Sequence, residues 1–192
     1  MAQVSMPVEG ERRGAPPVLF GTILFLASEL LFFGGLFAAY FALRAETNPW
    51  PPADVELDIV RSAVATVLLV ISSFTFQAGV RSAEREHHGA FRNWTIATIA
   101  LGVAFLAIQI FDYTTLPFEV SSNAYGTMYY AMTGMHALHV FAGLLLMVVV
   151  LGRAALGAYR GGRVDGLHAA AYYWHFVDVV WIALFATIFL VQ

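Results

Sequence analysis

Long apolar runs alternate with short polar segments along this chain. Five runs are long enough to cross a bilayer as helices, which takes about 20 residues each. The strands of a membrane barrel would be shorter and would alternate apolar with polar positions. The pattern therefore predicts an all-α, polytopic membrane bundle of five transmembrane helices behind a polar N-terminal tail at 1–17. The expected spans are 18–43, 59–80, 94–111, 128–151 and 169–191.

The polar segments between these spans carry arginine unequally. Only Arg44 and Arg61 lie on one side of the expected bundle, together with several acidic residues. The other arginines lie in the tail and in the second and fourth loops: Arg12, Arg13, Arg81, Arg85, Arg92, Arg153, Arg160 and Arg163. Because basic residues concentrate in cytoplasmic loops, we expect the N-terminus to be cytoplasmic and the C-terminus to lie outside.

Composition supports a membrane protein and excludes several kinds of chemistry. Hydrophobic residues make up 59% of the chain and charged residues 12%, against about 25% charged in a typical soluble domain. Cysteine is absent, which excludes disulfides, thiolate metal sites and cysteine nucleophiles. The chain has no basic patch outside the loops, so we do not expect nucleic acid as a partner. The tail lacks the order of a signal peptide, and the first apolar run is expected to remain as a span.

A few polar residues interrupt the expected spans, and ionisable residues at such positions are functional candidates. A charged side chain near the bilayer centre costs about 2.5–3.5 kcal/mol on insertion scales. Each therefore needs a partner on another helix. The residues are Glu29, Gln77, Gln109, Asp112, His136, His139, His175 and Asp178.

Glu29 lies near the middle of the first span, and two roles remain open for it. It is either a carboxylate that exchanges protons or a structural acid that stays protonated and hydrogen-bonded between helices. Gly34 and Gly35 follow one turn later, and we expect them to let another helix approach closely.

The three intramembrane histidines raise the question of a metal or haem. His136 and His139 are three residues apart, and His175 lies on the last span. A bis-histidine haem needs one imidazole from each of two facing helices. The alternative, which we favour, is a set of interhelical hydrogen bonds without metal. His175 and Asp178 share a helix face, and we expect both to bond polar groups on spans 1, 3 or 4.

Four blocks of sequence resemble subunit III of the cytochrome c oxidases in the haem-copper superfamily. They are ILFLASELLFFGGLFAAYF at 23–41, WPP at 50–52, the segment FDYTTLPFEVSSNAYGTMYYAMTGMHALHVFAG at 111–143, and AAAYYWHFVDVVWIALF at 169–185. The blocks occur in the family's order and cover most of the chain from residue 23 onward.

The resemblance implies a non-catalytic subunit of an aerobic oxidase in a bacterial plasma membrane. In that family the haems and copper are held by subunit I and the dinuclear copper centre by subunit II. Subunit III has no redox centre. It packs against subunit I, binds phospholipid, and supports proton uptake and sustained turnover in a complex that cytochrome c reduces.

Site residues carry over by position within the matched motifs. Glu29 matches a buried carboxyl known to react with a carbodiimide, and we expect it to be protonated and to face subunit I. The other matches are interhelical polar residues at Asp112, His136, His139, His175 and Asp178, and a residue that contacts lipid phosphate at Arg153.

The chain also departs from the family pattern. Longer members have seven spans, so the lipid cleft that their first two helices help to build is in question here. His168 and Asp112 stand where many members have glutamate.

Three alternatives compete with this interpretation. The same fold serves in quinol oxidases and as an accessory protein of nitric oxide reductases. A self-contained b-haem electron carrier would use His136, His139 and His175. A small transporter is disfavoured, because no pair of spans is broken by Gly or Pro at corresponding positions.

Overall fold

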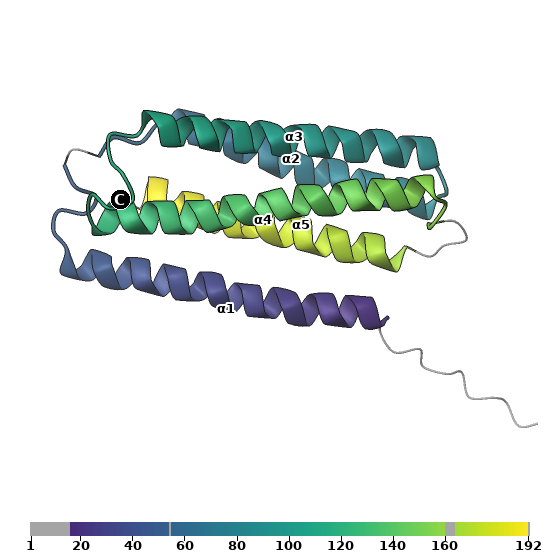
Figure 1. The fold of residues 1–192 in the computed structure, drawn as a ribbon, viewed down its shortest axis with the longest axis horizontal. Helices are drawn as coiled ribbons and strands as arrows, with labels where there is room; N and C mark the ends of the chain where they lie inside the picture. The colour runs from purple at the N-terminus through teal and green to yellow at the C-terminus, as the bar shows by residue number, and fades with distance from the viewer. Residues whose placement is uncertain (1–15, 54, 160–163, 192) are drawn as a thin grey trace, which may run out of the picture.

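The computed structural model describes residues 16–53, 55–159 and 164–191, and all regular secondary structure in these ranges is helical (Figure 1). Its elements are α1 (Pro17–Glu46), α2 (Ile59–Glu84), α3 (His88–Thr115), α4 (Ala124–Ala155) and α5 (Asp165–Phe185), which continues into a π-helical segment, η2 (Ala186–Leu190). Five spans are long and apolar enough to cross a membrane. The predicted all-α membrane bundle is confirmed.

Each helix runs beyond its predicted apolar core. The third span, expected at 94–111, is the helix His88–Thr115, and the fourth, expected at 128–151, is Ala124–Ala155. Backbone hydrogen bonds continue past the end of each apolar run, so polar end residues that hydropathy assigns to loops are still helical. The fifth span, expected at 169–191, begins earlier, at Asp165, and changes to π-helix after Phe185.

Helix α5 lies at the centre of the bundle and α1 at its edge. α5 contacts α1, α2 and α4, while α2 packs most extensively against α3. In the most apolar stretch of each span, half of the α5–η2 residues are buried but only 6% of those in α1. Figure 1 shows α1 along one side of the bundle, with α2 and α5 behind α3 and α4.

The core forms around Trp174, whose indole is fully buried and donates from Nε1 to Ser72 Oγ at 3.0 Å. Gly102 on α3 and Gly143 on α4 flank the indole ring. A Cβ atom at Gly143 would lie 2.7 Å from the ring, and one at Gly102 would lie 3.0 Å from it. These two glycines let α3 and α4 close over α5.

Gly34 and Gly35 lie on a part of α1 that faces away from the bundle. A Cβ atom at either would meet no heavy atom within 4 Å among the described residues. No described helix of this chain approaches them, so the expectation that they let another helix approach closely stays a prediction about a helix of another chain.

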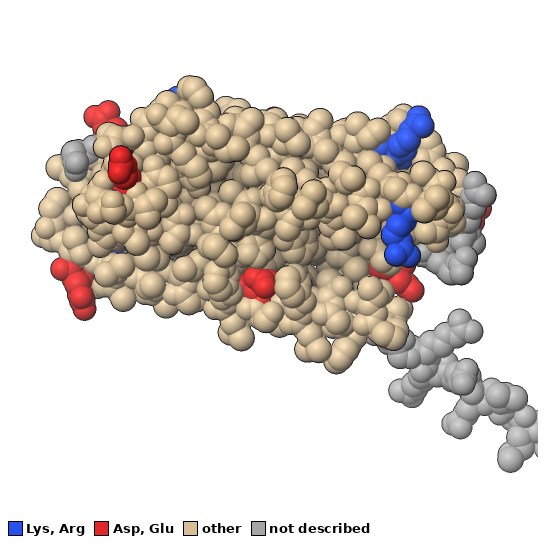
Figure 2. All heavy atoms as spheres, in the orientation of Figure 1, with Lys and Arg blue, Asp and Glu red and all other residues tan. Residues whose placement is uncertain are grey.

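Most of the charged side chains in view lie toward the two ends of the bundle, and one acidic side chain appears near mid-length (Figure 2). Arg81, Arg85, Arg92 and Arg153 lie at or near helix ends on the side where α1 begins, which we call the arginine-rich end. Arg44 and Arg61 lie toward the opposite end, which we call the acidic end. Of the other predicted cytoplasmic arginines, Arg12, Arg13, Arg160 and Arg163 lie outside the described residues, as does nearly all of the tail at 1–17.

Candidate functional site

Glu29 on α1 meets His139 on α4 part way along both helices. His139 Nε2 lies 3.0 Å from Glu29 Oε2, and the two side chains are 14% and 19% exposed. His139 Nδ1 lies 2.7 Å from the Met135 carbonyl oxygen one turn earlier on α4. The Phe33 ring packs edge-on against the imidazole at 5.1 Å. The structure thus gives Glu29 an intramolecular partner inside the membrane span.

The hydrogen bonds of His139 determine how many protons the pair holds. A carbonyl oxygen only accepts, so the Nδ1 of His139 must carry a hydrogen and donate it to Met135. The contact between Nε2 and Glu29 then holds one further proton, placed on either the carboxyl or the imidazole. Both arrangements are neutral overall, as protonated acid with neutral imidazole or as carboxylate with imidazolium. A neutral pair avoids most of the cost of a single charge in a bilayer.

His136, one turn before His139, lies in a different environment. Its ring is fully buried, stacks on Trp181 at 4.9 Å between ring centres, and meets Phe105 edge-on at 5.7 Å. Within the described part of the chain, neither ring nitrogen has a hydrogen-bond partner. His136 was expected to form an interhelical hydrogen bond, and the structure instead packs it among aromatic rings of α3 and α5.

His175 on α5 bonds to α2. Its Nδ1 lies 2.5 Å from Ser73 Oγ, and its Nε2 lies 3.1 Å from Gln77 Oε1. The expectation that its partners lie on spans 1, 3 or 4 is wrong, because this face of α5 packs on α2. Asp178, one turn further along, is 5% exposed and lies beside Ser73. No hydrogen bond to either of its carboxyl oxygens meets ordinary geometry among the described residues.

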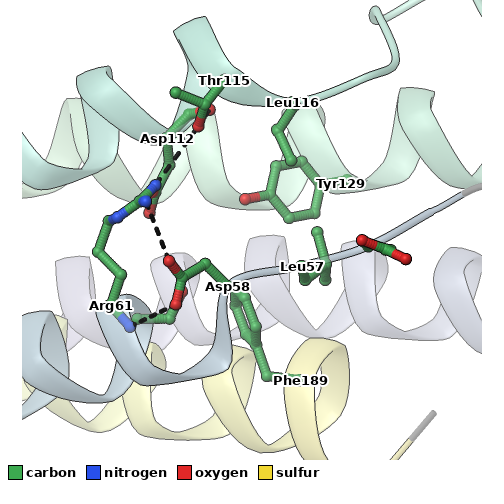
Figure 3. Close-up of a pocket in the computed structure, with 10 residues that line it drawn as sticks. Leu57, Asp58, Arg61, Asp112, Thr115, Leu116, Tyr129 and Phe189 are labelled. Carbon is green, nitrogen blue, oxygen red and sulfur yellow. Dashed lines mark hydrogen bonds and ion pairs between the residues drawn. The ribbon is translucent and has the colours of Figure 1, made fainter.

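Asp112, near the end of α3, pairs with Arg61 near the start of α2 (Figure 3). Arg61 Nη1 lies 2.7 Å from Asp112 Oδ1, and Arg61 Nη2 lies 2.9 Å from Asp58 Oδ2. Asp58 also caps α2 by accepting from the Arg61 backbone N–H at 2.9 Å. The guanidinium lies over the Phe111 ring, 4.9 Å from its centre. Asp58, Arg61 and Asp112 border a hollow at the acidic end. The lining of this hollow also includes Tyr129 and Phe189.

The sequence alone does not identify Arg61 as a site residue, because hydropathy places it beside a loop. Two sequence features could have indicated its role. It follows the capping residue Asp58 by three positions, and consecutive antiparallel spans bring the start of span 2 beside the end of span 3.

Arg153 lies in a hollow at the arginine-rich end, together with Tyr159 and Asp165. Burial raises the pKa of the Tyr159 phenol above its usual range, and the neighbouring Arg153 offsets part of this rise. A second, mainly apolar hollow adjoins the first through Gly166 and runs between α1, α4 and α5, lined by residues that include Phe25, Leu146 and Tyr173. A basic side chain thus stands at the mouth of an apolar groove.

His168 was noted as a departure from the family pattern. It bridges α5 to α2, with Nε2 3.3 Å from Glu84 Oε1. The side chains are 30% and 41% exposed, so the contact contributes little to stability.

A sequence profile of cytochrome c oxidase subunit III matches residues 13–192. The chain belongs to this family. Relatives of similar length include the probable cytochrome c oxidase subunit 3 of Nocardia farcinica, which is 44% identical over 91% of this chain and 88% of its own. The corresponding protein of Mycobacterium tuberculosis is 40% identical over the same shares. The cytochrome c oxidase subunit 3 of Thermostichus vulcanus is 39% identical over 90% of this chain and 86% of its own.

Membership confirms the resemblance seen in the sequence. It makes the chain a membrane-embedded part of an oxidase complex that contains other subunits. The chain spans 88% of the length of the Nocardia protein.

The hydrogen bonds of this subunit III chain bear on whether it holds a metal. His139 uses both ring nitrogens, for Met135 and Glu29, and His175 uses both of its own, for Ser73 and Gln77. A coordinating histidine needs one nitrogen free for the metal. Among residues 16–53, 55–159 and 164–191, no group of three or more His, Cys, Asp and Glu side chains is arranged to hold a metal ion.

Proposed function

We propose that this subunit III chain is a non-catalytic subunit of a cytochrome c oxidase in a bacterial plasma membrane. In this proposal the haems and copper belong to subunits I and II, cytochrome c delivers electrons to the complex, and this chain supports proton uptake and sustained turnover. The observation that carries the proposal is the occupation of both ring nitrogens of His139 and His175 by hydrogen bonds. It favours structural over redox roles for these imidazoles.

We place subunit I against α1. Only 6% of the most apolar stretch of α1 is buried within this chain, and the backbone at Gly34 and Gly35 is uncovered. Small residues let two membrane helices approach closely, and packing is the main force between helices in lipid. Glu29 lies one turn earlier on α1, so the proton shared with His139 is close to the proposed interface.

The Glu29–His139 pair serves, in this account, to hold one proton without net charge. The pair fastens the peripheral α1 to α4 while avoiding a lone carboxylate beside the proposed interface. Glu29 in its protonated form donates to His139 Nε2. This arrangement accounts for both roles left open by the sequence, because the same proton stabilises packing and remains exchangeable.

The two hollows at the arginine-rich end suit a phospholipid. Arg153 would bind the phosphate, and an acyl chain would lie in the apolar groove between α1, α4 and α5. An arginine guanidinium matches phosphate oxygens in geometry and charge. A lipid here would fill the space beside α1 without the two additional helices of longer family members.

The proposal is tested by purifying the complex through an affinity tag on this chain. We expect haem and copper to co-purify and oxygen uptake to be driven by reduced cytochrome c. Oxygen uptake driven only by quinol would favour the quinol oxidase alternative. A tagged chain that purifies without any haem-bearing partner would overturn the proposal.

A further inference from the structure

A groove with polar residues at its floor runs between α2 and α5, which lie side by side behind α3 and α4 in Figure 1. Its floor includes Ser73, Gln77, His175 and Asp178, and its walls include Phe74 and Val179. Phe74 is 72% exposed and Val179 is 65% exposed. We call this the α2–α5 groove. Polar residues inside a membrane rarely face lipid and usually face protein or a water-filled cavity.

Ser73 connects the floor residues of the groove. His175 Nε2 lies 3.1 Å from Gln77 Oε1, and His175 Nδ1 lies 2.5 Å from Ser73 Oγ. Ser73 also lies beside the Asp178 carboxyl. A serine hydroxyl carries a single hydrogen, so it can donate to His175 or to Asp178 but not to both.

Ser73 can serve at most one oxygen of the Asp178 carboxyl. The other oxygen lacks a partner among the described residues, whichever protonation state the carboxyl takes. The side chain is 5% exposed and lines the groove. Neither of its oxygens has an ordinary hydrogen bond within the described residues. A buried acceptor without a partner is costly, and the groove is the side from which a donor can reach it.

We propose that the α2–α5 groove holds a membrane-spanning helix of another subunit of the oxidase complex, and that this helix presents a hydrogen-bond donor to Asp178. The inference rests on the proposed function, since it requires the chain to sit in a complex.

The depth of Asp178 favours a protein helix over a phospholipid. Asp178 is 13 residues after the start of α5 at Asp165, which corresponds to about 20 Å along the helix axis at 1.5 Å per residue. The hydrocarbon core is about 30 Å thick, so this carboxyl lies far from the headgroups. An acyl chain fits the walls beside Phe74 and Val179 but donates no hydrogen bond. A side chain such as Ser, Asn or Arg on a partner helix does.

The test is photo-crosslinking in the assembled complex. p-Benzoylphenylalanine replaces Val179 in one preparation and Phe74 in another, and membranes are irradiated before the complex is purified. Both positions are exposed walls of the groove, so neither replacement disturbs the core. We expect each to give an adduct with a membrane-spanning segment of another oxidase subunit, identified by mass spectrometry of the crosslinked peptides. An adduct with phospholipid alone, or with a second copy of this chain, would overturn the inference.

The donor is tested in the Val179 preparation with two further changes. Asp178→Asn keeps an acceptor oxygen and should retain the adduct. Asp178→Leu removes it and should lower the adduct yield roughly tenfold, the effect of losing one buried hydrogen bond. Equal yields from the two variants would refute the contact with Asp178. If Asp178→Leu prevents assembly, the identity of the adduct in the unchanged sequence still decides the occupant.

The outcomes also separate this inference from the proposed function. A chain that purifies with haem and copper but crosslinks only to lipid refutes the groove's occupant and leaves the oxidase role intact. A chain that purifies without any oxidase partner refutes the oxidase role itself.

Discussion

His139 Nε2 lies 3.0 Å from Glu29 Oε2 and joins α4 to α1 within the membrane span. Because His139 Nδ1 donates to the Met135 carbonyl, this contact holds one proton and no net charge. α1 is the least buried span of the bundle, so a polar contact at mid-length matters more to it than to the central helices.

Changing Glu29 tests whether the pair acts through a neutral hydrogen bond. Glu29→Gln keeps a donor for His139 Nε2, so we expect assembly to persist with a stability loss below about 1 kcal/mol. Glu29→Leu leaves Nε2 buried without a partner and should cost about 1–3 kcal/mol. Thermal unfolding of the purified complex measures both. Loss of assembly in Glu29→Gln would show that the carboxylate charge, rather than a hydrogen bond, is required.

Gly143 tests the close packing around Trp174. A methyl group at Gly143 would lie 2.7 Å from the indole ring, and the fully buried ring cannot move aside freely. Gly143→Ala should therefore destabilise the chain by about 1–3 kcal/mol. Gly152→Ala, on the same helix with no heavy atom within 4 Å of the new methyl group, is the matched control and should be neutral or stabilising. Equal melting temperatures for the two variants would contradict the packing around Trp174.

Arg153 tests the phospholipid site. Arg153→Gln removes the charge at the mouth of the apolar groove, and we expect fewer phospholipids per complex by phosphorus analysis. Arg85→Gln removes a charge at the same end of the bundle, outside both hollows, and should leave the lipid content unchanged. A lipid content unaffected by Arg153→Gln would count against the site.

The pair formed by the partly exposed Arg61 and the buried Asp112 is suited to a double-mutant cycle. Arg61→Gln leaves the Asp112 carboxyl, 9% exposed, without its strongest partner and should destabilise α2 against α3. The same change in an Asp112→Asn background should be milder, because no carboxylate is then stranded. Additive effects on the melting temperature would mean that the two side chains do not depend on one another.

Substituting each of the three intramembrane histidines tests whether this chain holds a redox centre. We expect complexes with His136→Asn, His139→Asn or His175→Asn to keep the haem absorption spectrum of the unchanged complex. The isolated chain in detergent should show no Soret band. A Soret band that disappears with any of these substitutions would assign a haem to this chain.

The sequence predicts the spans well, since five apolar runs each need about 20 residues and hydropathy finds them. It is weaker on the partners of polar residues, which depend on how each helix is rotated. The partners of His175 are Ser73 and Gln77 on α2, whereas other spans were expected. A serine is a weak sequence signal for a contact between helices, because its hydroxyl often bonds its own helix, as Ser72 does with the Leu69 carbonyl.

Two further differences have the same physical origin. His136 and His139 are three residues apart, yet they face different neighbours. His136 packs among aromatic rings of α3 and α5, whereas His139 meets Glu29 on α1. Gly34 and Gly35 signal close helix packing but face away from this chain's own helices. A sequence pattern marks a packing surface without saying which chain supplies the other side.

Native mass spectrometry of the intact complex, purified through this chain, tests the central claim most directly. The account predicts one assembly that contains this chain together with a haem-bearing subunit I and a copper-bearing subunit II, and it predicts that this chain dissociates with the mass of its polypeptide alone or with bound phospholipid. The account would be contradicted if the chain were released with haem attached, or if it were found only apart from the redox-active subunits.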